Sequence, residues 1–139
     1  MAGELIVGYD GTDGARAALA EAVELGRQLG AGVVVAFAYE PPALGAEVAD
    51  HRRLLEERGK ALTDEALASL GGAGVEATAA VVGARPVEAL LTIAEEQQAR
   101  MIVVGTGGES PLMGVVLGAT PYRLLHRSTV PVLVVPTPA

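Results

Sequence analysis

The stretch that decides the fold is residues 4–39, which read ELIVGYDGTDGARAALAEAVELGRQLGAGVVVAFAY. It begins with a short apolar run, Glu4–Tyr9, which predicts a buried strand that ends in a polar capping turn, Asp10–Asp13. Small and aliphatic residues then recur at helical spacing up to a stop signal at Gly30. A second continuous apolar run, Val33–Tyr39, follows. The order strand, helix, strand predicts the first unit of a parallel sheet.

The same alternation continues along the rest of the chain. After a predicted loop at residues 40–50, amphipathic patterns predict helices over about Ala49–Leu70, from Pro86 onward, and over about Thr120–Arg127. Apolar runs predict strands at Val75–Val82, Met101–Val104 and Val130–Val135. Strands that are apolar on both faces, with helices that carry one apolar stripe, are typical of a parallel sheet covered on both sides. We therefore predict an α/β fold with one open five-stranded parallel sheet, helices on both faces, and a single domain over residues 1–139.

Composition excludes several classes of protein. Half of the 139 residues are apolar, so the chain can bury a core and is not disordered. It contains no cysteine, which excludes a disulfide scaffold, a thiolate zinc site and a cysteine nucleophile. The net charge of −7 argues against nucleic acid or an anionic membrane as partner. Because we find neither an apolar run long enough to span a membrane nor a signal peptide, we expect a cytoplasmic protein.

The loop after the fourth predicted strand is rich in glycine. Gly105, Gly108 and Gly118 have the spacing G-x2-G-x9-G, and the loop leads into a predicted helix. Glycine lets a ligand approach backbone N–H groups closely, and a helix N-terminus adds oriented N–H groups, so together they favour a phosphate. Ligands of open α/β sheets bind at the carboxyl ends of the strands, where Asp10 follows the first strand. The alternative is a loop that needs several turns and binds nothing.

These residues resemble those of universal stress proteins of the nucleotide-binding branch. The family motif, G-x2-G-x9-G followed by Ser or Thr, is matched by Gly105, Gly108 and Gly118. The segments Val7–Thr12 and Pro131–Val135 resemble the first and last strands of the family. The resemblance covers the whole chain and implies the strand order 3-2-1-4-5. It also implies an adenine nucleotide as ligand, ATP in the first place, with AMP and cyclic AMP as alternatives.

The resemblance further implies a set of binding residues: Asp10 beside the adenosine, Ala38 on the base, Val104 and Gly105 beside the ribose, and Gly108 and Gly118 at the phosphates. The Ser or Thr of the motif is replaced by Ala119, and Thr120 follows it. We expect the N–H groups of Ala119 and Thr120, or the hydroxyl of Thr120 or Ser110, to replace that contact. Because the loop has no lysine, Mg²⁺ is expected to help offset the charge of a bound triphosphate.

Catalysis has little support in the sequence. Phosphoryl transfer needs metal ligands, a positioned base and charge neutralisation at the phosphate, and the glycine loop offers none that spacing can identify. Neither His51 nor His126 has a second zinc ligand three or four residues further along the chain. We therefore predict a sensor or regulator of a stress response that binds ATP, and not an enzyme.

The last predicted strand, residues 130–135, lies at the edge of a sheet that has the order 3-2-1-4-5. A bare apolar edge strand invites pairing with another chain, while Pro131 and Pro136 limit the length of that pairing. Members of the resembled family form dimers through this strand, so we expect a homodimer. The alternative is an edge that a helix or the tail covers. A second functional reading, favoured by Ala119, is a dimeric interaction module of the same fold without nucleotide.

Overall fold

The computed structural model describes residues 3–40, 48–106 and 118–138. Strands and helices alternate along the described chain: β1 Leu5–Gly8, α1 Asp13–Leu29, β2 Val33–Tyr39, α2 Val48–Ser69, β3 Ala77–Gly83, α3 Pro86–Glu96, β4 Met101–Gly105, α4 Ala119–Arg127 and β5 Val132–Val135. The strands form one parallel sheet in the order β3-β2-β1-β4-β5. This confirms the predicted α/β fold, its five parallel strands and the strand order that the resemblance implied.

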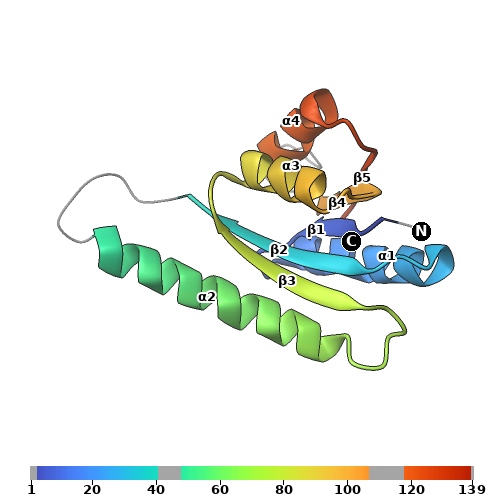
Figure 1. Cartoon of the computed structure of the whole chain (residues 1–139), viewed down its shortest axis with the longest axis horizontal. Helices are drawn as coiled ribbons and strands as arrows, with labels where there is room; N and C mark the ends of the chain where they lie inside the picture. Colours follow the sequence, from blue (N-terminus) through green and yellow to red (C-terminus); the bar gives the residue numbers. More distant parts are fainter. Residues whose placement is uncertain (1–2, 41–47, 107–117, 139) are drawn as a thin grey trace.

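The helices cover both faces of the sheet, as predicted (Figure 1). On one face α1 packs against β1 and β4, and α2 packs against β2 and β3. On the other face α3 crosses β2, β1 and β4, while α4 packs against α3 and β5. The carboxyl ends of β1, β2 and β4 therefore open toward the space where α3 and α4 begin.

Some element boundaries differ from the prediction. Strand β3 begins at Ala77 rather than Val75, because Gly74 has a φ of +83° and the chain is still turning there. Strand β5 begins at Val132 rather than Val130, since Pro131 has no N–H to donate to a ladder, although its carbonyl accepts from the Ile102 N–H at 3.0 Å. These differences shorten two edge strands and leave the topology unchanged.

Side chains on the α3 and α4 face become smaller toward the carboxyl ends of the strands. In β1 the buried Ile6 is followed on this face by Gly8, and in β2 Val34 is followed by Ala36 and Ala38. The opposite face keeps large side chains, because Val33 and Val35 lead to Phe37 and Tyr39. The taper on one face leaves room between the sheet and the helices above it, and that room is the candidate site.

Candidate functional site

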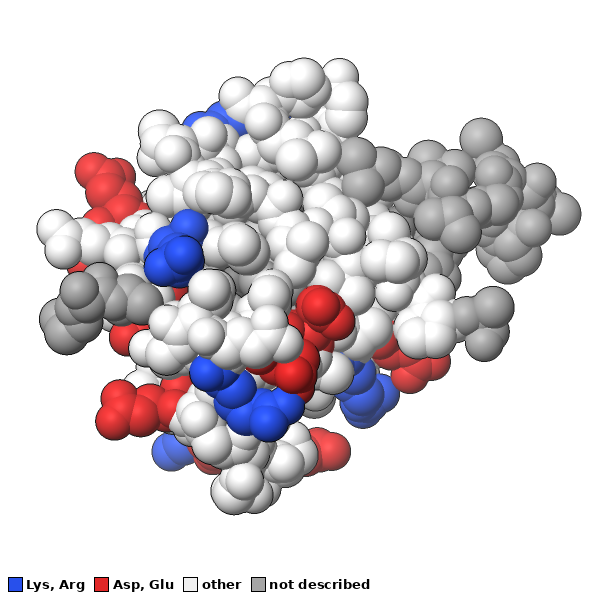
Figure 2. Space-filling model, turned by 90° about the vertical axis from the view of Figure 1, so that its right-hand side faces the viewer, with Lys and Arg blue, Asp and Glu red and all other residues white. Residues whose placement is uncertain are grey.

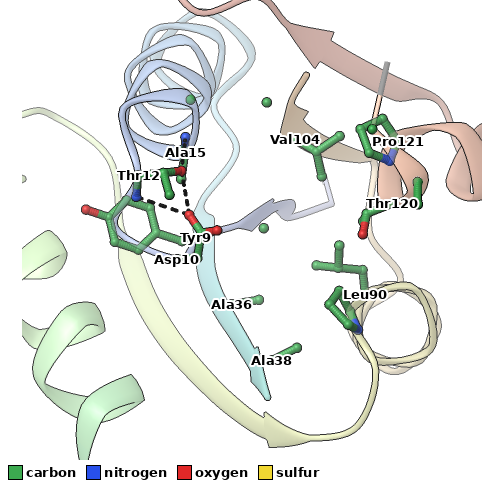
Figure 3. Close-up of a pocket in the computed structure, with 16 residues that line it drawn as sticks. Tyr9, Asp10, Thr12, Ala15, Ala36, Ala38, Leu90, Val104, Thr120 and Pro121 are labelled. Atoms are coloured by element: carbon green, nitrogen blue, oxygen red, sulfur yellow. Dashed lines mark hydrogen bonds between the residues drawn. The ribbon is translucent and has the colours of Figure 1, made fainter. Parts of the chain in front are cut away.

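A cavity of about 300 Å³ lies at the carboxyl ends of β1, β2 and β4. Its walls come from the start of α1, from α3 and from the start of α4. In Figure 3, Asp10 and Thr12 lie on one side of the cavity, and Leu90, Thr120 and Pro121 lie on the other. The volume is at the lower end of the range for small-molecule sites.

Most of the residues predicted from the sequence line this cavity. They are Asp10, Ala38, Val104, Gly105, Gly118, Ala119 and Thr120. Gly108 and Ser110 lie outside the described residues. The fold thus brings together residues from the turn after β1, from β2 and β4, and from the start of α4, which are far apart in the sequence. Their part in binding stays a prediction.

The floor of the cavity is apolar and flat. Gly8 and Ala36 are register partners on neighbouring strands, and Ala38 follows on the same face of β2. A Cβ added to Gly8 would lie 3.2 Å from Val104 Cγ1 and 3.3 Å from Leu90 Cδ1, so a larger residue there would press on both side chains. Small side chains on a flat strand surface favour contact with a planar ring.

The wall at the start of α1 carries a hydrogen-bonded pair, Asp10 and Thr12. The N–H and the hydroxyl of Thr12 both donate to Asp10 Oδ1, at 3.1 and 2.6 Å. The same hydroxyl accepts from the Ala15 N–H at 3.2 Å, so Thr12 is the N-cap of α1. Gly11, with a φ of +81°, makes the turn between them. The N-cap therefore lies within the capping turn Asp10–Asp13 that the sequence predicts.

The start of α4 presents two backbone N–H groups to the cavity. Its N-cap, Gly118, has no side chain to bond the first turn, and its own N–H donates to the Thr106 carbonyl at 2.8 Å. Pro121, in the same turn, has no N–H. Among the described residues this leaves the amides of Ala119 and Thr120 as the open donors of the first turn.

Gly105 has a packing reason to be glycine that is independent of any ligand. A Cβ at this position would lie 2.7 Å from the carbonyl oxygen of Gly14, in the first turn of α1. The end of β4 and the start of α1 therefore approach each other backbone to backbone. The glycine requirement at Gly105 is explained by this approach alone, so its presence does not by itself argue for a phosphate.

Positive charge is scarce around the cavity. Asp10 is the one charged side chain among the described lining residues, and residues 107–117 contain Glu109 but neither Lys nor Arg. Arg85, which precedes α3, pairs with Glu40 at 3.4 Å. On the face of the molecule seen in Figure 2, acidic and basic side chains are interspersed. A phosphate at this site would be held mainly by backbone N–H groups.

The remaining candidate residues lie away from the cavity. His51 and His126 are exposed, and the His126 ring meets the edge of Tyr122 with the centroids 4.6 Å apart. Arg127 donates to Glu88 at 2.9 Å, and this contact lowers the pKa of the Glu88 carboxyl. In the described ranges no three His, Asp or Glu side chains gather to form a metal site. No helix in those ranges is both long and apolar enough to cross a membrane.

The comparisons with known proteins agree with this architecture. The sequence profile of the Universal stress protein family matches residues 1–136, and the chain belongs to this family. It is 32% identical over 145 residues to a universal stress protein of Mycobacterium tuberculosis, and the match covers 96% of this chain and 95% of that protein. A universal stress protein of Thermus aquaticus is 35% identical over 136 residues, 94% of this chain and 96% of its own length.

A solved relative at 30% identity carries a ligand. A universal stress protein crystallised in complex with cAMP is 30% identical, has a TM-score of 0.70, and the match covers 99% of this chain and 100% of that one. The likeness extends over both chains, so it includes all the segments that line the cavity.

Sequence reasoning missed part of the lining. Pro86 and Leu90 of α3 form a wall of the cavity, and Gly14 and Pro121 complete its rim. Leu90 lies on the buried face of its helix, where it is 3% exposed. The topology could have indicated this wall. The helix α3 follows the edge strand β3 and leads to β4, so it must cross the carboxyl ends of β2 and β1.

Proposed function

We propose that this chain binds an adenine nucleotide in the cavity at the carboxyl ends of β1, β2 and β4. The observation that carries the proposal is the convergence of three features in one cavity. They are an apolar floor at Ala36 and Ala38, an acceptor at Asp10, and open N–H groups at Ala119 and Thr120. The relative that holds cAMP supports the class of ligand.

The order of the sheet supports one orientation of the nucleotide. Strand β1 lies between β2 and β4, and α4 follows β4. In the proposed orientation the base rests on Ala36 and Ala38 of β2, and the phosphate meets the start of α4. The ribose then lies between them, beside Asp10, whose carboxylate accepts hydrogen bonds from hydroxyl groups.

ATP is the proposed ligand, with AMP and cyclic AMP as the alternatives. The described lining supplies no cation, so the charge of a triphosphate would need Mg²⁺ held through the phosphates themselves. A monophosphate or a cyclic phosphate brings less charge and needs less compensation. Relative affinities for the three nucleotides at a fixed Mg²⁺ concentration decide among them.

The biological role that we propose is that of a nucleotide-dependent sensor or regulator in a stress response. Membership of the universal stress protein family supports this role. Among the described lining residues, none beside the proposed phosphate position is suited to be a base, so turnover is not part of the proposal. The cytoplasmic location stays a prediction.

We also propose that the chain forms a homodimer through β5. All four residues of this edge strand are only partly buried. Because the Ile102 N–H bonds the Pro131 carbonyl, and Ile102 pairs in register with Val132, odd-numbered residues of β5 bond β4. Val132 and Val134 then direct their backbone N–H and C=O groups to the open edge. Sedimentation that gives a monomer at every concentration would contradict this proposal.

A dimeric interaction module without nucleotide is the second candidate. The observation that favours it is Ala119, which stands where the family motif has Ser or Thr and offers no hydroxyl to a phosphate. In this reading the cavity exists because the side chains on this face of β1 and β2 become smaller toward the carboxyl ends, and it binds no ligand.

Mass spectrometry of nucleotides released from the purified protein separates these candidates. We expect an adenine nucleotide in the released fraction, and a thermal shift with ATP, AMP or cyclic AMP at millimolar concentration. Gly118→Val should abolish the shift because its side chain would occupy the approach to the Ala119 and Thr120 amides. Gly71→Val, after the end of α2, is the matched control and should keep it. Absence of both nucleotide and shift would favour the interaction module.

A further inference from the structure

Thr12 does more at the cavity wall than cap a helix. Its hydroxyl accepts from the Ala15 N–H at 3.2 Å and donates to Asp10 Oδ1 at 2.6 Å. Its N–H donates to the same Asp10 oxygen at 3.1 Å. Because the hydroxyl proton is directed to Asp10, the lone pairs of the oxygen are free for the helix amide. One residue thus connects the rigid first turn of α1 to an exposed carboxylate.

These hydrogen bonds use one oxygen of Asp10 and leave the other available. Both contacts end on Oδ1, and no described residue donates to Oδ2. In Figure 3 the Asp10 side chain extends from the Thr12 side toward the cavity. An ionised carboxylate oxygen only accepts hydrogen bonds, so the ligand group that meets Oδ2 must be a donor.

We infer that Thr12 is a positioning residue for nucleotide recognition, and that it holds Asp10 so that Oδ2 accepts a hydrogen bond from a ribose hydroxyl. This inference rests on the proposed function, which puts the ribose beside β1. It adds a specificity: the site favours a nucleotide that carries the ribose hydroxyl bonded by Oδ2 over the deoxy analogue that lacks this hydroxyl, and the preference depends on the hydroxyl of Thr12. Asp10 itself would touch the ligand, whereas Thr12 would act only through Asp10.

The physical reason is the freedom of an exposed carboxylate. Asp10 is exposed, and among the described residues its side chain is held by Thr12 alone. Without the hydroxyl, the carboxylate keeps only the longer bond from the Thr12 N–H and samples other rotamers. Ordering it again on binding costs conformational entropy, and the bond to the ligand weakens accordingly.

The test measures dissociation constants of AMP, 2′-deoxy-AMP and 3′-deoxy-AMP by calorimetry. We expect the native protein to lose about tenfold in affinity for at least one deoxy analogue, the value of a hydrogen bond to a charged group. Thr12→Val should weaken AMP binding by about fivefold to tenfold and leave the affinity for that analogue unchanged. Thr12→Ser keeps the hydroxyl and should bind all three nucleotides like the native chain.

A second variant separates positioning from capping. Thr12→Gly removes the hydroxyl but costs the helix start only a few tenths of a kcal/mol, since glycine is tolerated at the N-cap. It should show the same loss of ribose discrimination as Thr12→Val, and circular dichroism reports whether α1 is intact. Equal weakening of AMP and both deoxy analogues in the Val and Gly variants would overturn the inference, because a purely structural role lowers every affinity together.

The remaining outcomes also decide the question. The native protein could bind AMP and both deoxy analogues with equal affinity. This result would overturn the role of Asp10 and Thr12, although nucleotide binding itself would stand. Native protein that binds none of the three nucleotides, nor ATP or cyclic AMP, overturns the proposed function and this inference with it. Discrimination that disappears in the Val and Gly variants and returns in the Ser variant supports the inference.

Discussion

Filling the floor of the cavity should raise stability and lower nucleotide affinity at the same time. Ala38 lies on the cavity side of β2, and its register partner on β3 is Val82. Ala38→Val adds two methyl groups to a strand position, where a β-branched residue is favourable. The added groups enter an existing space of about 300 Å³, so the substitution does not overpack the core.

The expected magnitudes follow from burial. Two fully buried carbons would stabilise the protein by about 1.5 kcal/mol, and about half of this remains because one side of the cavity is open. For a chain of this length the unfolding temperature should rise by about 2 °C. The same methyl groups occupy the space of the proposed base, and overpacking of about 1–3 kcal/mol lowers the affinity about tenfold or more.

Differential scanning fluorimetry and calorimetry measure the two effects on the same samples. Ala79→Val is the matched control, since Ala79 is an exposed strand residue of β3 that does not line the cavity. The control should leave nucleotide affinity unchanged. Native affinity in the Ala38→Val protein would refute the placement of the base, and a large loss of stability would refute the description of the cavity as open space.

Three further outcomes are expected. Gly105→Ala should destabilise the protein by about 1–3 kcal/mol in urea unfolding, because its Cβ would lie 2.7 Å from the Gly14 carbonyl oxygen, while Gly71→Ala should change stability by less than about 0.5 kcal/mol. Tyr39→Phe removes the 2.6 Å bond to Glu56 and should cost about 1 kcal/mol at neutral pH. Burial, and then the hydrogen bond to Glu56, raise the pKa of Tyr39 above its usual 10.0, so the contribution of this hydroxyl is complete below about pH 10 and is lost as the pH rises through the higher folded-state pKa. The difference in free energy of unfolding between the native and Tyr39→Phe proteins should therefore disappear in strong alkali. A difference that stays constant with pH would contradict this. Val134→Pro should prevent dimerisation in sedimentation experiments and keep the monomer folded, since that N–H faces the open edge; a dimer in this variant would place the interface elsewhere.

The sequence predicts the fold well because its signals are local and repeated. Apolar runs such as Val33–Tyr39 and capped amphipathic segments between them leave few arrangements other than a parallel sheet with helices on both faces. Asp10 and Gly105 could be expected near each other because parallel strands end at one edge of the sheet, and both line the cavity.

The rest of the site depends on contacts between distant segments, which the local patterns of a single sequence do not predict. Leu90 enters the lining only because α3 crosses the carboxyl ends of the strands. The approach of Gly105 to Gly14 is a contact between β4 and α1, and it gives the glycine a structural reason that the motif alone does not suggest. The sequence predicts a helix cap near Thr12, because capping is a local signal. It does not predict the bond from the Thr12 hydroxyl to Asp10, because that bond depends on the turn at Gly11.

The most direct test of nucleotide binding at this cavity is a titration of ¹⁵N-labelled protein with ATP and Mg²⁺, AMP and cyclic AMP, followed by amide chemical shifts. We predict saturable shifts with at least one nucleotide, concentrated on the amides of Gly8, Asp10, Gly105 and Ala119. Unchanged spectra with all three nucleotides at millimolar concentration would contradict the central claim. So would shifts concentrated at a separate groove, beside Gln98 and Thr129.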